Sequence, residues 1–384
     1  MASGRGAEMS QPNALIVYRG PLERSRLSFL AEAIARVHGP TTLVWICPRP
    51  VNDRRKARLD EFVADEPGIS SARIFNGHKN RLLSVARQIQ KEWQRYTGPV
   101  VAVGFTAPLY AAAIARGPYV WCVNGIPEDE ALRNGSRLSS LGATMQWRVQ
   151  LRLRRHPDLV VTVSEPMSQM IRDRQGLSPV FTVPNCVDLE TFLFAGVSGR
   201  DSAVYSGWGA PWQNLSHLAL VWSELAARDS ALRFRVISGD PRARVLVERL
   251  PENRTEFQST LQASTVAELL RVGRLGFLLR EDTLTNRVSY PTKFGEYVAA
   301  GVPVMTTELD WDLSALVAQT GCGLLLDPGE SPAQHAARIM SYQEEAPLTE
   351  AMITRCHDAA RKLDRATWVE RLAARLSELT PGRH

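Results

Sequence analysis

The chain of 384 residues lacks paired cysteines. Its five cysteines lie far apart in the sequence, and no C-x-x-C motif occurs. This spacing argues against a disulfide framework or a zinc site, and it is typical of a protein in a reducing compartment. Residues 1–12 also lack an apolar core, so we expect no signal peptide and a cytoplasmic location.

Long uncharged segments are scarce as well. Residues 97–115 carry no formal charge, which is about the length of a membrane-spanning helix. Glycine and proline interrupt this segment repeatedly, so we expect a strand, a turn and a helix there instead. The interrupting residues are Gly98, Pro99, Gly104 and Pro108.

Several catalytic signatures are absent. No G-x-G-x-x-G motif follows a predicted strand, which removes the main support for a dinucleotide oxidoreductase. The P-loop motif G-x-x-x-x-G-K-[ST] does not occur, and neither do H-E-x-x-H and G-x-S-x-G. The chemistry must therefore be sought in other patterns.

The sequence does contain two series of short apolar strands alternating with helices. At 44% hydrophobic and 22% charged residues it is typical of a folded protein, and its length favours two domains. The first series of strands is predicted at residues 14–18, 42–47, 100–103, 119–123, 159–163 and 180–183, and the second at residues 203–206, 232–238, 256–258, 275–279, 302–306 and 324–327. This pattern predicts the α/β class, with two doubly wound parallel sheets joined near residues 185–199 and a site in the crevice between them.

Residues 280–304, which read REDTLTNRVSYPTKFGEYVAAGVPV, carry a specific motif. They resemble the donor-site segment of retaining glycosyltransferase family 4 in its P-T-K-x-x-E-Y-x-A-x-G-x-P-V form. Residues 163–167 and 183–188 resemble the end of that family's first domain and its crossover into the second. Trp368 lies in a closing helix that resembles the family's terminal helix.

The resemblance implies the GT-B fold, in which two Rossmann-like parallel-sheet domains face an interdomain cleft. Residues 1–184 would form the acceptor-binding domain, residues 185–364 the donor-binding domain, and residues 365–384 a helix packing back on the first domain. The implied activity is metal-independent, retaining transfer of a hexose-type sugar from a nucleoside-diphosphate donor to a cell-envelope polysaccharide or glycolipid. The nucleotide sugar would be a substrate, and no cofactor is expected.

The residue chemistry of the donor segment is consistent with this resemblance. Pro291 suits the first turn of a helix, whose positive N-terminus with Lys293 would attract a diphosphate. Arg280 follows an apolar strand, where its guanidinium can bind phosphate through two donors. Both are assigned catalytic roles in stabilising the leaving diphosphate. By resemblance Glu296 accepts hydrogen bonds from the ribose hydroxyls, and further nucleotide-sugar contacts are assigned to Thr292, Phe294, Gly207 and Arg287.

The segment departs from the commoner family pattern in two places. Val288 stands where the family often has the first of two glutamates, so Glu281, Asp282 or Asn286 is expected to reach the sugar instead, and Asp282 is taken as the third catalytic candidate. Residues 206–213 lack the family's usual Arg and Lys, which shifts the electrostatic role to Arg280, Arg287 and Lys293. Both departures leave open whether the mechanism is unchanged and whether the chain is active.

Asp310-Trp311-Asp312 looks like the metal-binding D-x-D motif of the other glycosyltransferase fold. The motif follows a predicted strand and opens a predicted helix over residues 313–319. Because an aspartate at a helix N-terminus caps free amides, we interpret these residues as a cap and predict no metal site.

Charge is unevenly distributed along the chain. Residues 1–195 hold 25 Lys and Arg against 17 Asp and Glu, whereas the rest holds 21 against 23. Arg148, Arg152 and Arg155 share one predicted helical stripe beside an apolar one, as in a helix lying on an anionic membrane. The alternatives are a solvated amphipathic helix and a simply arginine-rich composition. Nucleic acid is not expected, because no aromatic residues are interleaved with the arginines.

The acceptor side has weaker signals. Arg19 and Gly20 follow the first predicted strand, and Asn124 follows the strand at residues 119–123, so all three are expected at the cleft edge. Each is equally compatible with a plain turn. Two other functions remain open at this stage: a nucleotide-sugar epimerase on the same scaffold, and a non-catalytic nucleotide-sugar binding protein.

Overall fold

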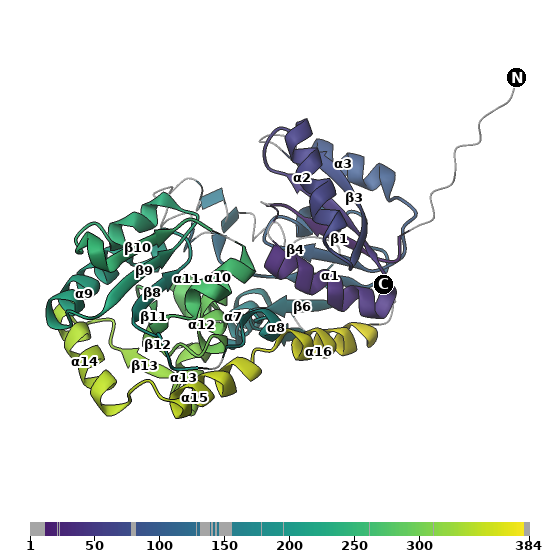
Figure 1. The fold of residues 1–384 in the computed structure, drawn as a ribbon. Helices are drawn as coiled ribbons and strands as arrows, with labels where there is room; N and C mark the ends of the chain where they lie inside the picture. The colour runs from purple at the N-terminus through teal and green to yellow at the C-terminus, as the bar shows by residue number, and fades with distance from the viewer. Residues whose placement is uncertain are drawn as a thin grey trace, which may run out of the picture.

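The computed structural model describes residues 12–20, 22, 24–77, 82–127, 129–130, 139, 141–142, 144–145, 156–177, 179–194, 196–260, 262–309 and 311–379. The elements form two parallel sheets in separate halves of the molecule (Figure 1). The α/β fold with two Rossmann-like parallel-sheet domains is therefore confirmed.

The first domain is built on a seven-stranded sheet in the order β3-β2-β1-β4-β5-β6-β7. The central strands are short and fully buried, which is why their apolar runs could be recognised in the sequence. Its strands are β1 (Leu15–Tyr18), β2 (Thr41–Cys47), β3 (Ile69–Asn76), β4 (Val100–Val103), β5 (Tyr119–Cys122), β6 (Leu159–Thr162) and β7 (Val180–Thr182). Its helices include α1 (Arg24–His38), α2 (Asp53–Ala64), α3 (Leu82–Glu92), α4 (Pro108–Ala111) and α7 (Glu165–Gln175).

The second domain is built on a six-stranded sheet in the order β10-β9-β8-β11-β12-β13. Its strands are β8 (Ser202–Ser206), β9 (Arg233–Ile237), β10 (Thr255–Gln258), β11 (Gly273–Leu278), β12 (Val304–Thr307) and β13 (Gly323–Leu326). Its helices are α8 (Leu189–Phe192), α9 (Leu215–Arg228), α10 (Ala263–Leu270), α11 (Leu284–Val288), α12 (Thr292–Ala299), α13 (Asp312–Thr320), α14 (Pro332–Glu345) and α15 (Glu350–Arg361). Chain order reverses between β8 and β11, and in the first sheet between β1 and β4. Ligands of doubly wound sheets bind at the carboxyl ends of such strand pairs.

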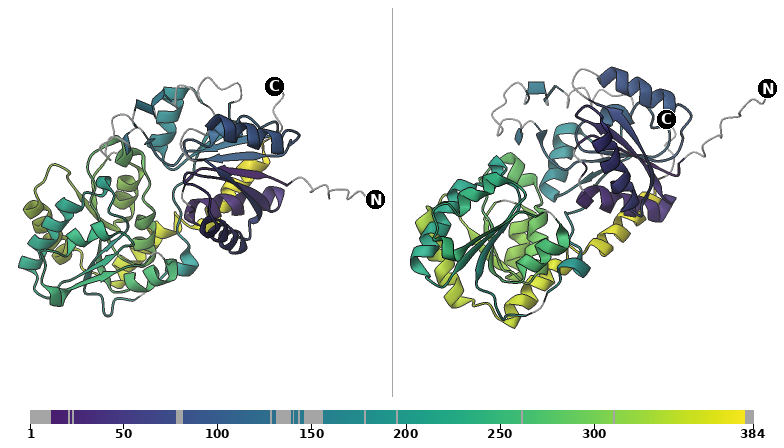
Figure 2. Two further views of the ribbon diagram at one scale, coloured as in Figure 1. Left: turned by 90° about the horizontal axis from the view of Figure 1, so that it is seen from above. Right: turned by 45° about the horizontal axis from the view of Figure 1, so that its top comes forward.

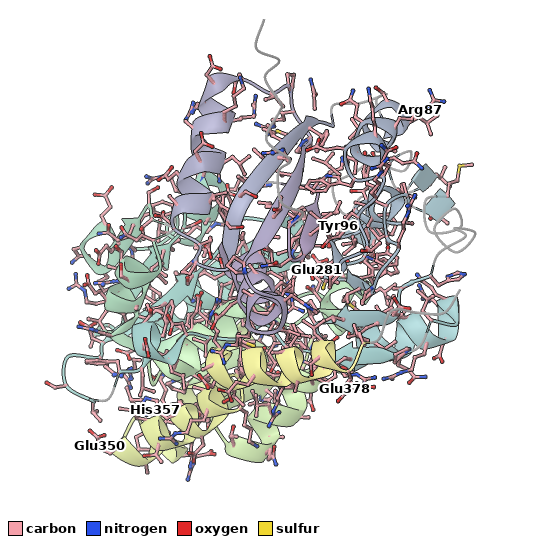
Figure 3. All side chains as sticks on the ribbon, turned by 90° about the vertical axis from the view of Figure 1, so that its right-hand side faces the viewer. Arg87, Tyr96, Glu281, Glu350, His357 and Glu378 are labelled. Carbon is pink, nitrogen blue, oxygen red and sulfur yellow. The ribbon has the colours of Figure 1, made fainter. Side chains whose placement is uncertain are left out.

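The last helix, α16 (Arg365–Ser377), lies against α1 of the first domain (Figure 2). Val369 and Leu372 are buried in the same core as Leu30 of α1, and Arg365 forms an ion pair with Glu32 at 2.9 Å. Figure 3 shows α15, marked by Glu350 and His357, and then α16, which ends next to Glu378. The chain thus returns to the domain in which it began.

The two passages of the chain between the domains are hydrogen-bonded to each other. Val187 on the first passage pairs in parallel with Asp364 on the second. The Val187 amide donates to the Leu363 carbonyl at 2.9 Å, and the Arg365 amide donates to the Val187 carbonyl at 3.0 Å. The domains are therefore joined by a two-stranded connection.

The segment around α11 contacts the first domain. Ser164 Oγ donates to the Val288 carbonyl at 2.6 Å, and the Thr285 amide donates to Asp129 Oδ2 at 2.9 Å. Asn185, just beyond β7, donates to the Tyr290 carbonyl at 2.6 Å. The segment between Arg280 and Lys293 therefore contacts the first domain.

Residues 97–115 form β4, a turn and the short helix α4, as predicted. Over the part of the chain that the structure describes, no helix has the length and apolar character needed to cross a membrane.

Candidate functional site

The candidate site lies at the carboxyl ends of β8 and β11, the strand pair at which chain order reverses in the second sheet. Gly207 follows β8 directly, and Arg280 comes two residues after β11. The N-terminal turn of α12, with Lys293 as its second residue, meets the same edge. Three of the predicted residues are therefore brought together by the fold.

Arg280 is a buried cation with few partners. Its side chain is 5% exposed, Nη1 donates to Asn286 Oδ1 at 2.8 Å, and Nε is buried without a hydrogen-bond partner. Burial lowers the pKa of the guanidinium to about 10, so it stays charged at neutral pH. A buried charge without a counter-charge is costly, which favours an anion at this place.

Lys293 is a second buried cation in the same cluster. Its Nζ donates to Gln213 Oε1 at 3.0 Å and to the Tyr205 hydroxyl at 3.2 Å, and it lies 4.3 Å from the centre of the Tyr205 ring. Burial, and then the charge of Arg280, hold the pKa of the ammonium group well below its usual value, while Glu296 opposes them. A bound anion would offset both effects, because it favours the charged form of the lysine beside Arg280.

The backbone of Gly207 lies close to the Lys293 side chain. Its φ of +139° belongs to a region that side-chain-bearing residues rarely adopt. A Cβ added there would lie 2.4 Å from Lys293 Nζ and 2.8 Å from Cε. Glycine is therefore favoured by the backbone at this position, and any side chain would have to displace Lys293 from its present place.

Helix α12 divides its residues between the site and the core. Thr292 and Glu296, one turn apart, are partly exposed on one face. Burial raises the pKa of Glu296 to about 7, with Lys293 opposing the shift, so this carboxyl group titrates near neutral pH. Phe294 is fully buried in the hydrophobic core, so the prediction of a nucleotide-sugar contact by its side chain is wrong. It falls on the helix face that packs against the sheet.

Asp282 and Arg287 are bound to each other. Arg287 Nε donates to Asp282 Oδ1 at 2.5 Å, and Nη2 donates to Oδ2 at 2.6 Å. Hydrogen bonds from Arg287 lower the pKa of Asp282, and both side chains are about half exposed. Their charges cancel locally, so this geometry offers neither a free catalytic carboxylate nor a free phosphate-binding cation.

Two further residues, Gln213 and Asn286, contact Lys293 and Arg280, and no sequence pattern predicted these contacts. Asn286 is fully buried, and its Nδ2 donates to the carbonyls of Trp212 and Glu281 at 3.0 and 2.8 Å. All of its amide atoms are thus used within the protein, and it does not point a free group toward a sugar. The sequence offers one signal for Gln213. The loop of residues 206–213 contains no basic residue, and its last residue is a glutamine.

Val288, at the place of the expected glutamate, is buried with 4% of its surface exposed. Its carbonyl accepts the hydrogen bond from Ser164. The position serves the contact between the domains and contributes no carboxylate to the site.

The acceptor-side residues lie at the carboxyl edge of the first sheet. Arg19 follows β1, donates to the Gly77 carbonyl at 3.4 Å, and has a buried Nε without a partner. Gly20 leaves no room for a Cβ, which would lie 2.5 Å from the Tyr18 hydroxyl, and its carbonyl accepts from Trp45 at 2.9 Å. Asn124 follows β5 and is exposed.

The D-x-D motif has a different use from the one predicted. Asp312 begins α13, but its Oδ2 accepts from the Glu165 amide at 2.8 Å, so it caps the first turn of α7 in the other domain. Asp310 lies outside the described residues, as do Arg148, Arg152 and Arg155 of the predicted membrane-binding stripe. Among the described residues, no group of His, Cys, Asp and Glu is arranged to hold a metal ion.

Comparison with known families and structures adds to this geometry. Residues 29–191 match the family model described as Glycosyltransferase Family 4. This part of the chain is a glycosyltransferase domain. The match lies mainly in the first domain, whereas the cation cluster described above lies in the second.

Solved glycosyltransferase structures share the fold over nearly the whole chain. The Anabaena protein Alr3699/HepE in complex with UDP-glucose is 16% identical, with a TM-score of 0.70 and coverage of 96% of this chain and 100% of that one. Sucrose-phosphate synthase from Thermosynechococcus elongatus is 12% identical, with a TM-score of 0.68 and coverage of 96% and 98%. WaaG, a glycosyltransferase of lipopolysaccharide biosynthesis, is 12% identical, with a TM-score of 0.66 and coverage of 95% and 99%. A comparison with curated protein sequences finds no match.

The family match over residues 29–191 and the shared GT-B fold both support a glycosyltransferase. At these identities, the solved structures establish the architecture alone. The substrates of this chain must be inferred from its own site.

Proposed function

We propose that the protein transfers a sugar from a nucleoside-diphosphate donor to a saccharide or lipid-linked acceptor, without a metal ion and with retention of configuration. The observation that carries the proposal is the pair of buried cations, Arg280 and Lys293, at the switch point of the second sheet. Among the residues that the structure describes, no carboxylate forms an ion pair with either of them.

A diphosphate is the anion that this arrangement suits best. It brings two adjacent phosphate groups, and each can accept donors that the protein leaves unused at the guanidinium and the ammonium group. The N-terminal turn of α12 adds the positive end of a helix dipole. Three related crystal structures of the Anabaena protein hold UDP, UDP-glucose, or UDP with glucose, which makes a uridine nucleotide the first donor to test.

The proposed chemistry uses the cations as fixed electrostatic groups. As the glycosidic bond to the donor phosphate breaks, negative charge grows on the leaving diphosphate, and Arg280 and Lys293 stabilise it. Removing one preorganised donor of this kind costs about 3 kcal/mol, or roughly 10²–10³ in rate. Glu296, one turn further along α12, accepts hydrogen bonds from the ribose hydroxyls.

The acceptor is proposed to bind at the carboxyl edge of the first sheet, near Arg19, Gly20 and Asn124. A cell-envelope polysaccharide or glycolipid is consistent with the positive charge of residues 1–195. Attachment to the inner face of the membrane through Arg148, Arg152 and Arg155 belongs to the same proposal.

Thermal stabilisation by a panel of nucleoside diphosphates tests the donor site. A ligand at 100 times its Kd stabilises the protein by about 2.7 kcal/mol. For a domain of this size, that corresponds to roughly 5–10 °C in Tm. We expect one nucleotide to raise the Tm of the wild type, and Glu296→Ala and Lys293→Ala to reduce the effect. Failure of every nucleotide at millimolar concentration would contradict the proposal.

A non-catalytic nucleotide-sugar binding protein is the second candidate. The buried Val288 favours it, because no carboxylate occupies that position. Incubation with the stabilising nucleotide sugar separates the two, since an enzyme with its acceptor releases the nucleoside diphosphate. A binding protein would be stabilised by the same ligand without releasing it.

A further inference from the structure

We propose that Gln213 and Asn286 are positioning residues that hold Lys293 and Arg280 through neutral amide oxygens, so that both cations keep their charge for the incoming diphosphate. This inference rests on the proposed donor site. It concerns how the site is held in place and goes beyond the identity of its ligand.

Gln213 holds the lysine through its side-chain oxygen. It ends the short 3-10 helix Pro211–Gln213 of the β8–α9 loop, is 8% exposed, and accepts from Lys293 Nζ at 3.0 Å. The Tyr205 hydroxyl takes a second donor of the ammonium group. Because an ammonium group has three donors, one remains for a ligand.

Asn286 fixes the guanidinium, and its amide can be oriented in only one way. Its nitrogen must face the carbonyls of Trp212 and Glu281, since carbonyl oxygens only accept hydrogen bonds. Its oxygen is thereby turned to Arg280 Nη1 at 2.8 Å. The Trp212 contact also ties the loop that carries Gln213 to the loop that carries Arg280, so the two cations are held by one connected network.

The neutral partners are notable because carboxylates hold other arginines nearby. Asp282 binds Arg287 through both of its oxygens, and so does Asp240, in the segment after β9, with Arg242. Asp240 also accepts a hydrogen bond from the Gly209 amide of the β8–α9 loop. Those pairs cancel their own charge. At the two buried cations an amide oxygen supplies the hydrogen bond without a negative charge, and the net charge of the pair remains available.

The nearby carboxyl of Glu296 does not remove this charge. Burial raises its pKa to about 7, so the group is only partly ionised at neutral pH. An anion that enters the site therefore meets two basic side chains, Arg280 and Lys293, and a carboxyl group that readily accepts a proton.

Gln213→Glu tests the inference, because it keeps an oxygen at hydrogen-bonding distance from Lys293 and adds a charge. If Gln213 only holds Lys293 in place, Q213E will bind the nucleoside diphosphate better than Q213A, which loses the contact. If the absence of charge on Gln213 matters, Q213E will bind the nucleoside diphosphate less tightly than Q213A. Its affinity will then be about 10- to 100-fold below that of the wild type. Titration calorimetry with the nucleotide selected by thermal stabilisation measures this order.

Two controls make the result specific. Gln90→Glu adds the same charge on the exposed face of α3 in the first domain and should leave the affinity unchanged. N286D and N286A repeat the comparison at Arg280. If Q213E does not fold, the inference is tested by whether N286D binds the nucleotide less tightly than N286A. Nucleotide binding by the wild type with Q213E at least as tight as Q213A overturns this inference alone. Absence of binding by the wild type overturns the donor site and this inference together.

Discussion

Gly207→Ala is the substitution for which the structure gives the most detailed expectation. The new methyl group would lie 2.4 Å from Lys293 Nζ, well inside contact distance, so either the lysine or the loop must move. The φ of +139° adds backbone strain of about 1–3 kcal/mol for a residue with a side chain. We therefore expect both lower stability and weaker ligand binding.

The loss of binding can be estimated from the bonds of Lys293. Displacing Nζ breaks its hydrogen bonds to Gln213 and Tyr205, and hydrogen bonds of charged groups contribute about 1.5–3 kcal/mol. If the same displacement removes one contact to the diphosphate, affinity falls roughly 10- to 100-fold. Titration calorimetry on G207A with the stabilising nucleotide measures this change.

A substitution at a second glycine distinguishes the effect of backbone strain from that of the contact with Lys293. Gly176 caps the C-terminus of α7 with a φ of +62°, and a Cβ there would have no atom within 4 Å. G176A should therefore lose stability from strain alone and keep its nucleotide affinity.

A double-mutant cycle gives the refutation. In a K293A variant the methyl group added at Gly207 has no lysine side chain to displace. G207A should therefore reduce nucleotide affinity little further in that background. Equal losses of affinity from G207A in the wild-type and K293A backgrounds would show that the glycine does not act through Lys293.

Three further outcomes are expected. Because burial and Arg280 lower the pKa of Lys293, diphosphate affinity should decline with rising pH before the ordinary lysine range is reached. An affinity, measured by calorimetry, that stays flat up to the ordinary lysine pKa of about 10.4 would contradict this. Burial, together with His335 at 3.0 Å, lowers the pKa of His217, so the unfolded chain takes up a proton first and stability should fall as pH drops below about 6.5. His217→Gln should reduce that slope in Tm, and an unchanged slope would assign it to other groups. Arg200 donates to four backbone carbonyls away from the site, so Arg200→Met should cost about 3 kcal/mol in chemical denaturation while leaving nucleotide affinity unchanged.

The sequence predicted most of the sheet because the central strands are short, apolar and buried on both faces. Strand β3 was missed, since its residues read ISSARIFN and most of them are only partly buried at the edge of the sheet. Polar edge strands lack the apolar run on which the prediction of a parallel strand depends. The helices α2 and α3 next to it were left unassigned as well.

The two cations of the site could be predicted, but their surroundings could not. Arg280 and Lys293 follow local rules, the end of an apolar strand and the first turn of a helix. Gln213 lies 80 positions from Lys293, and no local pattern links an uncharged glutamine to a distant lysine. The pairing of Asp282 with Arg287 was missed because the bound partners look like free charges when taken one at a time.

The paired passages between the domains restrict how the molecule can move. A single linker would act as a swivel, allowing one domain to spin and tilt in any direction about the other. We expect two linkers bonded side by side through Val187 and Asp364 to allow bending about one axis and to resist twisting. Bending of this kind that separates the domains would draw the segment around α11 away from Ser164 and Asp129. Closing about the same axis would restore the same hydrogen bonds.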